Sequence, residues 1–277
     1  MRKQHTVGKS LLLSTGIALV SGLVVLAVHM QLSGHHISFT PVAKASGPTL
    51  HWPHNSLPVH LRVVNYSTTR VWPKHIDLSV TDWQRSGVVA ITQKEAGSDI
   101  CNLVYGEIGV CSFNQPNTNL ISWSQRGAQA DGHILFGQIN FNDAYLVSDA
   151  TYGNVVWRNY MMCYSLGFTL GLDQQIAPPE GGNSCMESTT FTNVKNQQHP
   201  SNVSLTALKS AYDHLDASRT LPETTSAPTQ VSSIAAPQSW GKLVFTSSDG
   251  AIRYYRADLD NGNILYTTAV FDQGYKK

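Results

Sequence analysis

Charged side chains are scarce in this chain of 277 residues. Asp, Glu, Lys and Arg together make up 13% of it, about half the usual share, and the formal net charge is only +1. This near-neutral balance gives no basis for a polyanionic partner, so we expect no binding to nucleic acid. The 42% of hydrophobic residues still allow a packed core. Ser, Thr, Asn and Gln must then dominate the surface, as we expect of an exported protein.

Cysteine is also sparse, and the four cysteines lack the C-x-x-C spacing of a structural zinc site. They are Cys101, Cys111, Cys163 and Cys185, and they fit an exported protein, in which disulfides persist. Four cysteines can pair in more than one way. We expect the sequential pairing, Cys101–Cys111 and Cys163–Cys185, because it closes two short loops.

Charge is absent altogether from Leu11 to Met30, an apolar run that follows a cluster of Arg and Lys. About 20 apolar residues can span a bilayer, so residues 1–30 predict an N-terminal signal anchor, a transmembrane helix with its basic end in the cytoplasm. The alternative is a signal peptide cleaved after Ala43-Lys44-Ala45. On either interpretation the rest of the chain is extracytoplasmic, anchored to the membrane or secreted.

Composition divides the remainder of the chain into four parts. Residues 31–49 read as a polar linker, 50–216 as one domain, 217–238 as a linker rich in Ser, Thr and Pro, and 239–277 as a β-hairpin tail. The tail carries two hairpin turn signals, Asp249-Gly250 and Asn261-Gly262-Asn263, between alternating segments.

The main domain reads as strands followed by helices. Residues 50–92 are strand-like, with clear runs at 57–64 and 87–92. Further short strands are expected between Asn102 and Leu146. Residues 152–170 predict a helix, because apolar side chains recur at spacings of three and four. A second helix is expected from residue 204 to residue 215.

The most informative segment runs from Met162 to Gln174 and is followed by Ser184-Cys185-Met186-Glu187. It keeps Cys163, Gly167, Gly171 and Met186 in the order and spacing of the metzincin pattern, H-E-x-x-H-x-x-G-x-x-H followed by a Met-turn. The chain thus resembles the metzincin zinc metallopeptidases, most closely the small secreted bacterial type, over roughly residues 55–216. The resemblance implies an α+β metalloprotease fold with a mixed, mostly parallel sheet, an active-site-type helix and a C-terminal helix. It makes Gly171 the helix-ending glycine and Met186 the residue of the Met-turn.

The residues that would bind zinc and act in catalysis are missing from this segment. Tyr164, Phe168 and Gln174 stand where the resemblance places the zinc-binding His residues, and Ser165 stands at the catalytic Glu. Phe168 cannot bind a metal, and Tyr164 and Gln174 are poor ligands for zinc. Ser165 has no neighbour in this segment that would activate it as a nucleophile. We therefore expect no cofactor at this site.

These observations predict a metallopeptidase-like pseudoenzyme that binds a polypeptide or a cell-envelope component in its vestigial cleft. One alternative is an active zinc metalloendopeptidase with an unconventional metal site, made by Tyr164, Gln174 and a distant His such as His133. Another is an envelope adaptor that docks through residues 239–277. His51 and His54 are expected at the surface, because the intervening Pro53 argues against a helical metal pair, and His133 is expected to be structural or exposed.

Overall fold

The computed structural model describes residues 49–96, 100–101, 103–173, 183–187, 191–217, 240–259 and 262–273. The predicted signal segment, residues 1–30, and nearly all of both predicted linkers lie outside this part, as does Gln174. Within the described residues no helix has the length and apolar character needed to cross a membrane.

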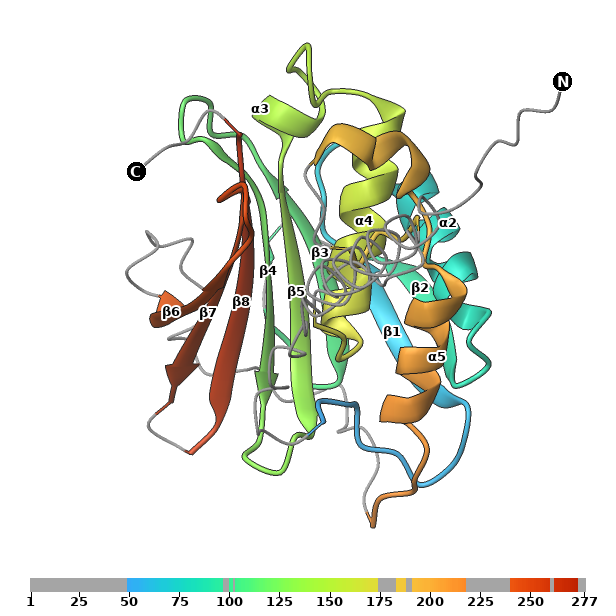
Figure 1. Ribbon diagram of the computed structural model, residues 1–277. Helices are drawn as coiled ribbons and strands as arrows, with labels where there is room; N and C mark the ends of the chain where they lie inside the picture. The colour runs from blue at the N-terminus through green and yellow to red at the C-terminus, as the bar shows by residue number, and fades with distance from the viewer. Residues whose placement is uncertain are drawn as a thin grey trace, which may run out of the picture. The chain divides into compact units, whose positions relative to one another are not determined.

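One mixed sheet of eight strands organises the described chain (Figure 1). Its spatial order is β2-β1-β3-β5-β4-β8-β7-β6. The strands are β1 Val59–Asn65, β2 Val89–Glu95, β3 Glu107–Phe113, β4 Leu120–Ala128, β5 Ile134–Asn142, β6 Lys242–Thr246, β7 Ile252–Asp258 and β8 Ile264–Phe271. The sequence correctly predicts a mixed sheet with few helices.

The prediction that most pairings are parallel is wrong. The pairs β2·β1, β1·β3 and β3·β5 are parallel, whereas the four pairs that join β5, β4, β8, β7 and β6 are antiparallel. The physical reason is the C-terminal part of the chain. Strands β6, β7 and β8, formed by the predicted tail, continue the main sheet, and β8 pairs with β4 from Leu120 to Ala128.

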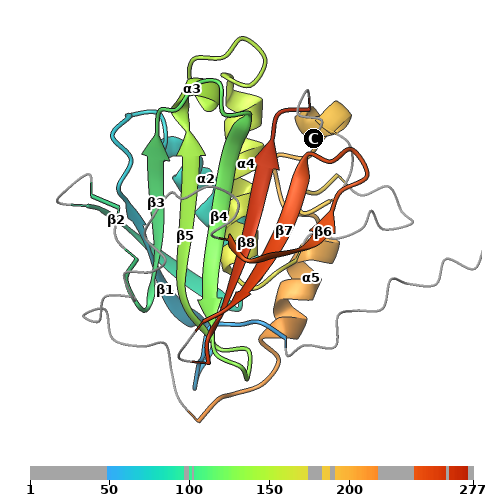
Figure 2. The same ribbon diagram turned by 90° about the vertical axis from the view of Figure 1, so that its left-hand side faces the viewer.

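Three helices lie on one face of the sheet: α2 Pro73–Gln84, α4 Val155–Thr169 and α5 Asn202–Ala211 (Figures 1 and 2). Two shorter pieces complete the set, α3 Asp143–Leu146 and the 3₁₀ helix η1 Phe191–Asn196. Helix α4 is the predicted active-site-type helix and α5 is the predicted C-terminal helix, both within a few residues of their expected bounds.

Helix α2 corrects the expectation that residues 50–92 are strand-like throughout. Pro73 occupies its first turn, where a missing backbone N–H does no harm. Ile76, Val80 and Trp83 follow at spacings of four and three and are buried against the sheet. The helix therefore connects the two parallel strands β1 and β2, as parallel neighbours require.

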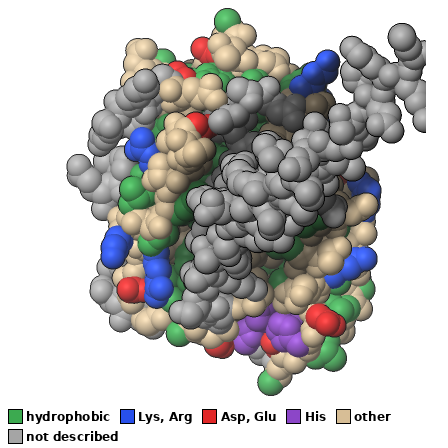
Figure 3. Space-filling view, in the orientation of Figure 1, with side chains coloured by type: hydrophobic (Ala, Val, Ile, Leu, Met, Phe, Trp, Pro, Cys, Tyr) green, Lys and Arg blue, Asp and Glu red, His purple; other side chains and the backbone are tan. Residues whose placement is uncertain are grey.

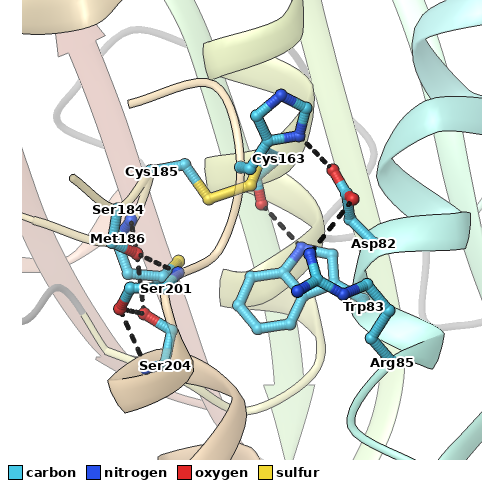
Figure 4. The surroundings of a disulfide bond; sticks show 10 residues. Asp82, Trp83, Arg85, Cys163, Ser184, Cys185, Met186, Ser201 and Ser204 are labelled. Carbon is cyan, nitrogen blue, oxygen red and sulfur yellow. Dashed lines mark hydrogen bonds and ion pairs between the residues drawn. A yellow bond between two sulfur atoms is a disulfide. The ribbon is translucent and has the colours of Figure 1, made fainter. Parts of the chain in front are cut away.

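Both predicted disulfides, Cys101–Cys111 and Cys163–Cys185, are present. The second one links helix α4 to the segment that carries Met186 (Figure 4). Trp83 of α2 packs beside it and donates its indole N–H to the carbonyl of Cys163 at 3.1 Å. The helix, the Met186 segment and α2 are thus joined at one place in the core.

Candidate functional site: the motif helix and a histidine cluster

Helix α4 has well-defined ends. The side chain of Asn154 caps its start by accepting hydrogen bonds from the N–H groups of Val156 and Trp157. At its end, Gly171 has φ +110°, and the N–H of Leu172 bonds the carbonyl of Gly167 at 3.1 Å. This is the Schellman arrangement, in which a left-handed glycine satisfies the last carbonyls of a helix. A Cβ on Gly171 would also lie 2.2 Å from the carbonyl oxygen of Leu50, so only glycine fits.

Tyr164, at the first degenerate ligand position, is completely buried. Its hydroxyl lies 2.7 Å from the Thr268 hydroxyl on β8 and donates to the Tyr254 hydroxyl on β7 at 3.1 Å. Burial, followed by the nearby Tyr254, raises the pKa of Tyr164 well above its ordinary value. The phenolate form, the only strong metal ligand that tyrosine offers, is therefore disfavoured.

Phe168, at the second ligand position, is also completely buried. Its ring packs edge-on against Tyr254, and the guanidinium carbon of Arg126 lies 4.2 Å from its centroid. Arg126 donates hydrogen bonds to the carbonyls of Phe168 and Leu172 and pairs with Asp173. The space beside α4 is thus filled by a buried cation, aromatic rings and hydroxyls.

Ser165 and Met186 complete the motif. Ser165 is buried, and its hydroxyl finds no hydrogen-bond partner among the described residues. Met186 is buried under the helix, where its sulfur lies 2.6 Å from the position that a Cβ on Gly167 would take. The Met186 turn is held by the Ser184 hydroxyl, which accepts from the Met186 N–H at 3.2 Å (Figure 4). Scaffold residues of the motif thus keep close contacts, and Tyr164 and Phe168 lie in the core.

A second constellation lies elsewhere, where histidine side chains gather at the lower end of the view in Figure 3. His51 precedes β1, His133 lies in the β4–β5 turn, and His214 and Asp216 follow α5. Backbone hydrogen bonds hold these segments together. The His51 N–H donates to the Gly132 carbonyl at 3.1 Å, the Ile134 N–H to the His51 carbonyl at 2.7 Å, and the Asp216 N–H to the His54 carbonyl at 2.7 Å. Figures 1 and 2 show the three segments at the same end of the sheet.

Asp216 is the centre of this cluster. His51 Nε2 and His54 Nδ1 lie 3.4 and 3.3 Å from its Oδ2. His133 Nε2 and His214 Nε2 lie 3.2 and 3.4 Å from its Oδ1. The Asp216 side chain is only 9% exposed, and His51 and His54 are buried. The expectation that His51 and His54 lie at the surface is therefore wrong, because the chain folds back over them after α5.

The electrostatics of Asp216 reflect these neighbours. Burial alone raises the pKa of its carboxyl, but the backbone N–H of His54, the hydrogen bond from His133 and the charge of His51 lower it to about 2. Burial also lowers the pKa of His51. Asp216 is thus held as a carboxylate, and burial favours the neutral form of the His51 ring; these are the forms in which the two side chains bind metals.

Sequence reasoning singles out His51, His54 and His133 one by one but does not bring them together. It misses His214 and Asp216, which stand two positions apart behind α5. It also misses Arg126, because a single Arg in a strand carries no motif. The structure places His133 beside Asp216, whereas the hydroxyl of Tyr164 contacts Tyr254 and Thr268.

No protein-family model matches the chain, and no curated protein matches it. Among solved structures it is similar to the crystal structure of archaemetzincin (amzA) from Methanopyrus kandleri, with 14% sequence identity and a TM-score of 0.34. The similarity covers 56% of this chain and 96% of that one. A likeness this weak carries no argument about the family or the activity of this chain. It says nothing of the small secreted bacterial type, and the proposals below rest on the residues of this chain.

Proposed function

We propose that the chain is an extracytoplasmic, metzincin-like domain that has lost zinc binding and proteolysis at helix α4, and that its N-terminal segment anchors it to the membrane or directs its secretion. One observation carries the loss of chemistry: Tyr164 and Phe168 are sealed into the core by β7 and β8. A catalytic zinc needs three protein ligands and one open position for water. Phe168 has no lone pair to offer, and the Tyr164 hydroxyl is already engaged. The two disulfides agree with an oxidising compartment.

Peptide cleavage tests this proposal directly. Full-length protein is incubated with a mixture of unstructured peptides, with and without a strong chelator, and the products are read by mass spectrometry. We expect no cleavage in either sample. Chelator-sensitive cleavage that is lost in Tyr164→Phe and kept in Tyr105→Phe, a partly buried tyrosine elsewhere, would overturn the proposal.

The accompanying role is the binding of an extended polypeptide at strand β6. Among the described residues this strand is the last of the sheet on its side, and all of its residues are exposed. Three consecutive apolar side chains, Leu243, Val244 and Phe245, are 47%, 55% and 39% exposed. Proteins usually protect such an edge, because its backbone groups can pair with another strand. Adding a strand is also a common mode of peptide recognition.

Charge indicates which polypeptides would fit. Lys242 of β6 lies opposite Arg256 of β7, which is paired with Asp258 at 3.0 Å, so the exposed Lys242 supplies the positive charge at this end of the edge. We therefore expect an extended segment with alternating apolar residues and an acidic end. We therefore place the binding surface at β6 and not in the cleft expected at α4, because residues of β7 and β8 pack against α4 there.

A binding assay with matched variants tests this role. Synthetic acidic, β-forming peptides are titrated into full-length protein and binding is followed by fluorescence anisotropy. We expect Val244→Glu to weaken binding about tenfold or more, because a charge then opposes the apolar strand. Val203→Glu, at a valine of α5 that is 44% exposed, should bind as the wild type does. Absence of peptide binding, or binding only to purified cell-wall glycan, would contradict it.

A second candidate, an active zinc metalloendopeptidase with an unconventional site, is favoured by one observation. His133, the distant His expected to join Tyr164 in such a site, instead lies in a cluster with Asp216 and His214, and this cluster would be the unconventional site. Chelator-sensitive cleavage that is lost in His214→Ala and kept in Tyr164→Phe would support this candidate over the first.

A further inference from the structure

We propose that His51, His133, His214 and Asp216 bind one zinc-class divalent ion, and that this ion fastens together three distant segments of the fold. The proposal goes beyond the function proposed above, because the cluster shares no residue with helix α4 or with strand β6. Three imidazoles and one carboxylate form a ligand set typical of zinc.

The imidazoles direct their Nε2 atoms inward. His51 Nδ1 lies 2.9 Å from the carbonyl of Thr49, and His133 Nδ1 lies 3.0 Å from a carboxylate oxygen of Asp131. An Nδ1–H that donates to a carbonyl or a carboxylate leaves the Nε2 lone pair free to bind a metal. This outer support is the usual arrangement around metal-binding histidines.

The distances between the inward atoms fit a single ion. The two Nε2 atoms of His51 and His214 are 3.0 Å apart, and the nearest Asp216 oxygens lie 3.2–3.4 Å from the three rings. Donors around a tetrahedral zinc, each at about 2.0–2.1 Å from the ion, are about 3.3 Å from one another. The spacings among His51, His214 and the two Asp216 oxygens therefore match those around a zinc ion, and His133 reaches the group through Asp216 Oδ1.

Without a metal, hydrogen bonds between the imidazole rings and Asp216 satisfy only some of the acceptor atoms in the cluster. With its Nδ1–H donated to Thr49, the neutral His51 ring presents an acceptor lone pair at Nε2. The Nε2 of His214 carries at most one proton, which can go to His51 or to Asp216 but not to both. A cation at the centre satisfies all of these lone pairs together.

His54 is a positioning residue in this arrangement. Its backbone N–H donates to Asp216 Oδ2 at 2.9 Å, and its carbonyl accepts from the Asp216 N–H at 2.7 Å. These two bonds hold the carboxylate in place from the side away from His133. The Nε2 of His54 is buried and has no hydrogen-bond partner among the described residues.

The placement of the ligands assigns the ion a structural role. With four protein ligands the site is closed, which is typical of structural rather than catalytic zinc. The ion joins the segment before β1, the β4–β5 turn and the segment after α5. Because such a site forms only in the folded chain, metal binding adds to stability.

Metal titration of the full-length protein tests the proposal. Chelator-stripped protein is titrated with zinc chloride by calorimetry, with its thermal midpoint recorded, and separately with Co²⁺ by visible absorption. We expect one equivalent of zinc, a raised midpoint and the strong absorption of tetrahedral Co²⁺. His214→Ala and Asp216→Asn should each weaken zinc binding at least tenfold, whereas His60→Ala, at an exposed histidine of β1, should not.

Two further measurements distinguish loss of the metal site from loss of the fold. His214 is 42% exposed at its side chain, so its replacement should leave the fold intact, which circular dichroism checks. The Co²⁺ spectrum of the wild type does not depend on any variant, and absence of tetrahedral absorption would overturn the proposal. Zinc uptake that is unchanged in both variants would reveal an adventitious ion only, with the same consequence. Neither result bears on the proposed loss of zinc at helix α4 or on peptide binding at β6, which are tested by peptide cleavage and peptide binding.

Discussion

At the scale of single residues, the motif helix has core side chains, Tyr164 and Phe168, at positions where the metzincin resemblance implies metal ligands. The Tyr164 side chain is longer than that of a histidine. Its hydroxyl reaches Tyr254 on β7 and Thr268 on β8. The sequence predicts the loss of ligands at Tyr164 and Phe168 from chemistry alone. It could not predict what fills the site, because Tyr254 and Thr268 lie about a hundred residues away along the chain.

The first prediction concerns the Tyr164 hydroxyl. Tyr164→Phe removes one buried hydrogen-bonding group and leaves Tyr254 and Thr268 without that partner. The free energy of unfolding should fall by about 1–3 kcal/mol, since buried groups lose their partners without gaining water. Chemical denaturation measures this, with Tyr105→Phe as the control that should stay close to the wild type. Equal stability of the two variants would show that the hydroxyl network contributes little.

The second prediction concerns Asp131, which touches the proposed metal centre only through His133. Asp131→Asn removes the negative charge that supports the His133 ring. Zinc affinity should fall about 10-fold to 100-fold, the usual effect of losing such an outer partner. Calorimetric titration gives the ratio, and Asp77→Asn on the exposed face of α2 serves as the control. An unchanged affinity would remove His133 from the ligand set.

The third prediction is a pH dependence at His75. Burial lowers its pKa below 6.5, and the nearby charges of Arg158 and Lys74 act in the same direction, although the hydrogen bond with Asn159 opposes them. Arg158 Nε donates to His75 Nε2 at 3.1 Å, so a protonated ring would set one donor against another.

The sign follows from linkage. Below pH 6.5 the unfolded chain binds a proton at His75 that the folded chain does not bind, so stability must fall as the pH falls. The contribution is complete above pH 6.5 and is lost between that value and the lowered pKa. Unfolding free energies at several pH values should show a shallower acid slope in His75→Gln than in the wild type. The exposed His60→Gln should keep the wild-type slope, and identical slopes in all three proteins would contradict the prediction.

At the scale of elements, local sequence signals identify most pieces but not their partners. The Asp249-Gly250 and Gly262 turns mark both hairpins of the tail correctly. Nothing local indicates that β8 will pair with β4, because that choice depends on matching edges far apart in sequence. Helix α2 is not predicted for another reason. It is short, it lies between the two strands β1 and β2, and the proline at its start, Pro73, is also common in turns.

The fourth prediction tests the packing of α4 against its neighbours. A Cβ at Gly167 would lie 2.4 Å from the Trp83 ring and 2.6 Å from the Met186 sulfur. Gly167→Ala gains about 1 kcal/mol in helix propensity. Overpacking costs about 1–3 kcal/mol, and here the Trp83 ring is fixed by its bond to Cys163, so destabilisation should dominate.

The control lies two positions away on the same helix. Ser165→Ala deletes a buried hydroxyl that has no hydrogen-bond partner among the described residues, so stability should stay level or rise. Thermal unfolding of the two variants should therefore give shifts of different sign or size. A Gly167→Ala protein as stable as Ser165→Ala would show that Trp83 and Met186 move aside easily.

At the scale of the whole molecule, the chain closes on itself in two ways. Strands β6, β7 and β8 extend the sheet at β4, and the segments before β1 and after α5 meet at Asp216. Both sets of contacts join residues more than a hundred positions apart in the sequence. Hydrophobic periodicity within one helix or strand cannot predict such contacts. The metzincin resemblance, which ends near residue 216, likewise says nothing of what the tail does.

The fifth prediction concerns that tail. A chain truncated after Ala217 would lose β6, β7 and β8, uncover the edge of β4 and expose Tyr164 and Phe168 beside the helix. An unpaired edge next to newly exposed aromatic rings favours association between chains. We expect the truncated protein to aggregate, or to bind a hydrophobic dye and unfold at a clearly lower denaturant concentration than the full chain. Hydrogen exchange should show the largest loss of protection in β4. A truncated protein that stays monomeric, with β4 protected as in the full chain, would mean that the tail is an appendage. The vestigial cleft would then regain its place as the candidate binding surface.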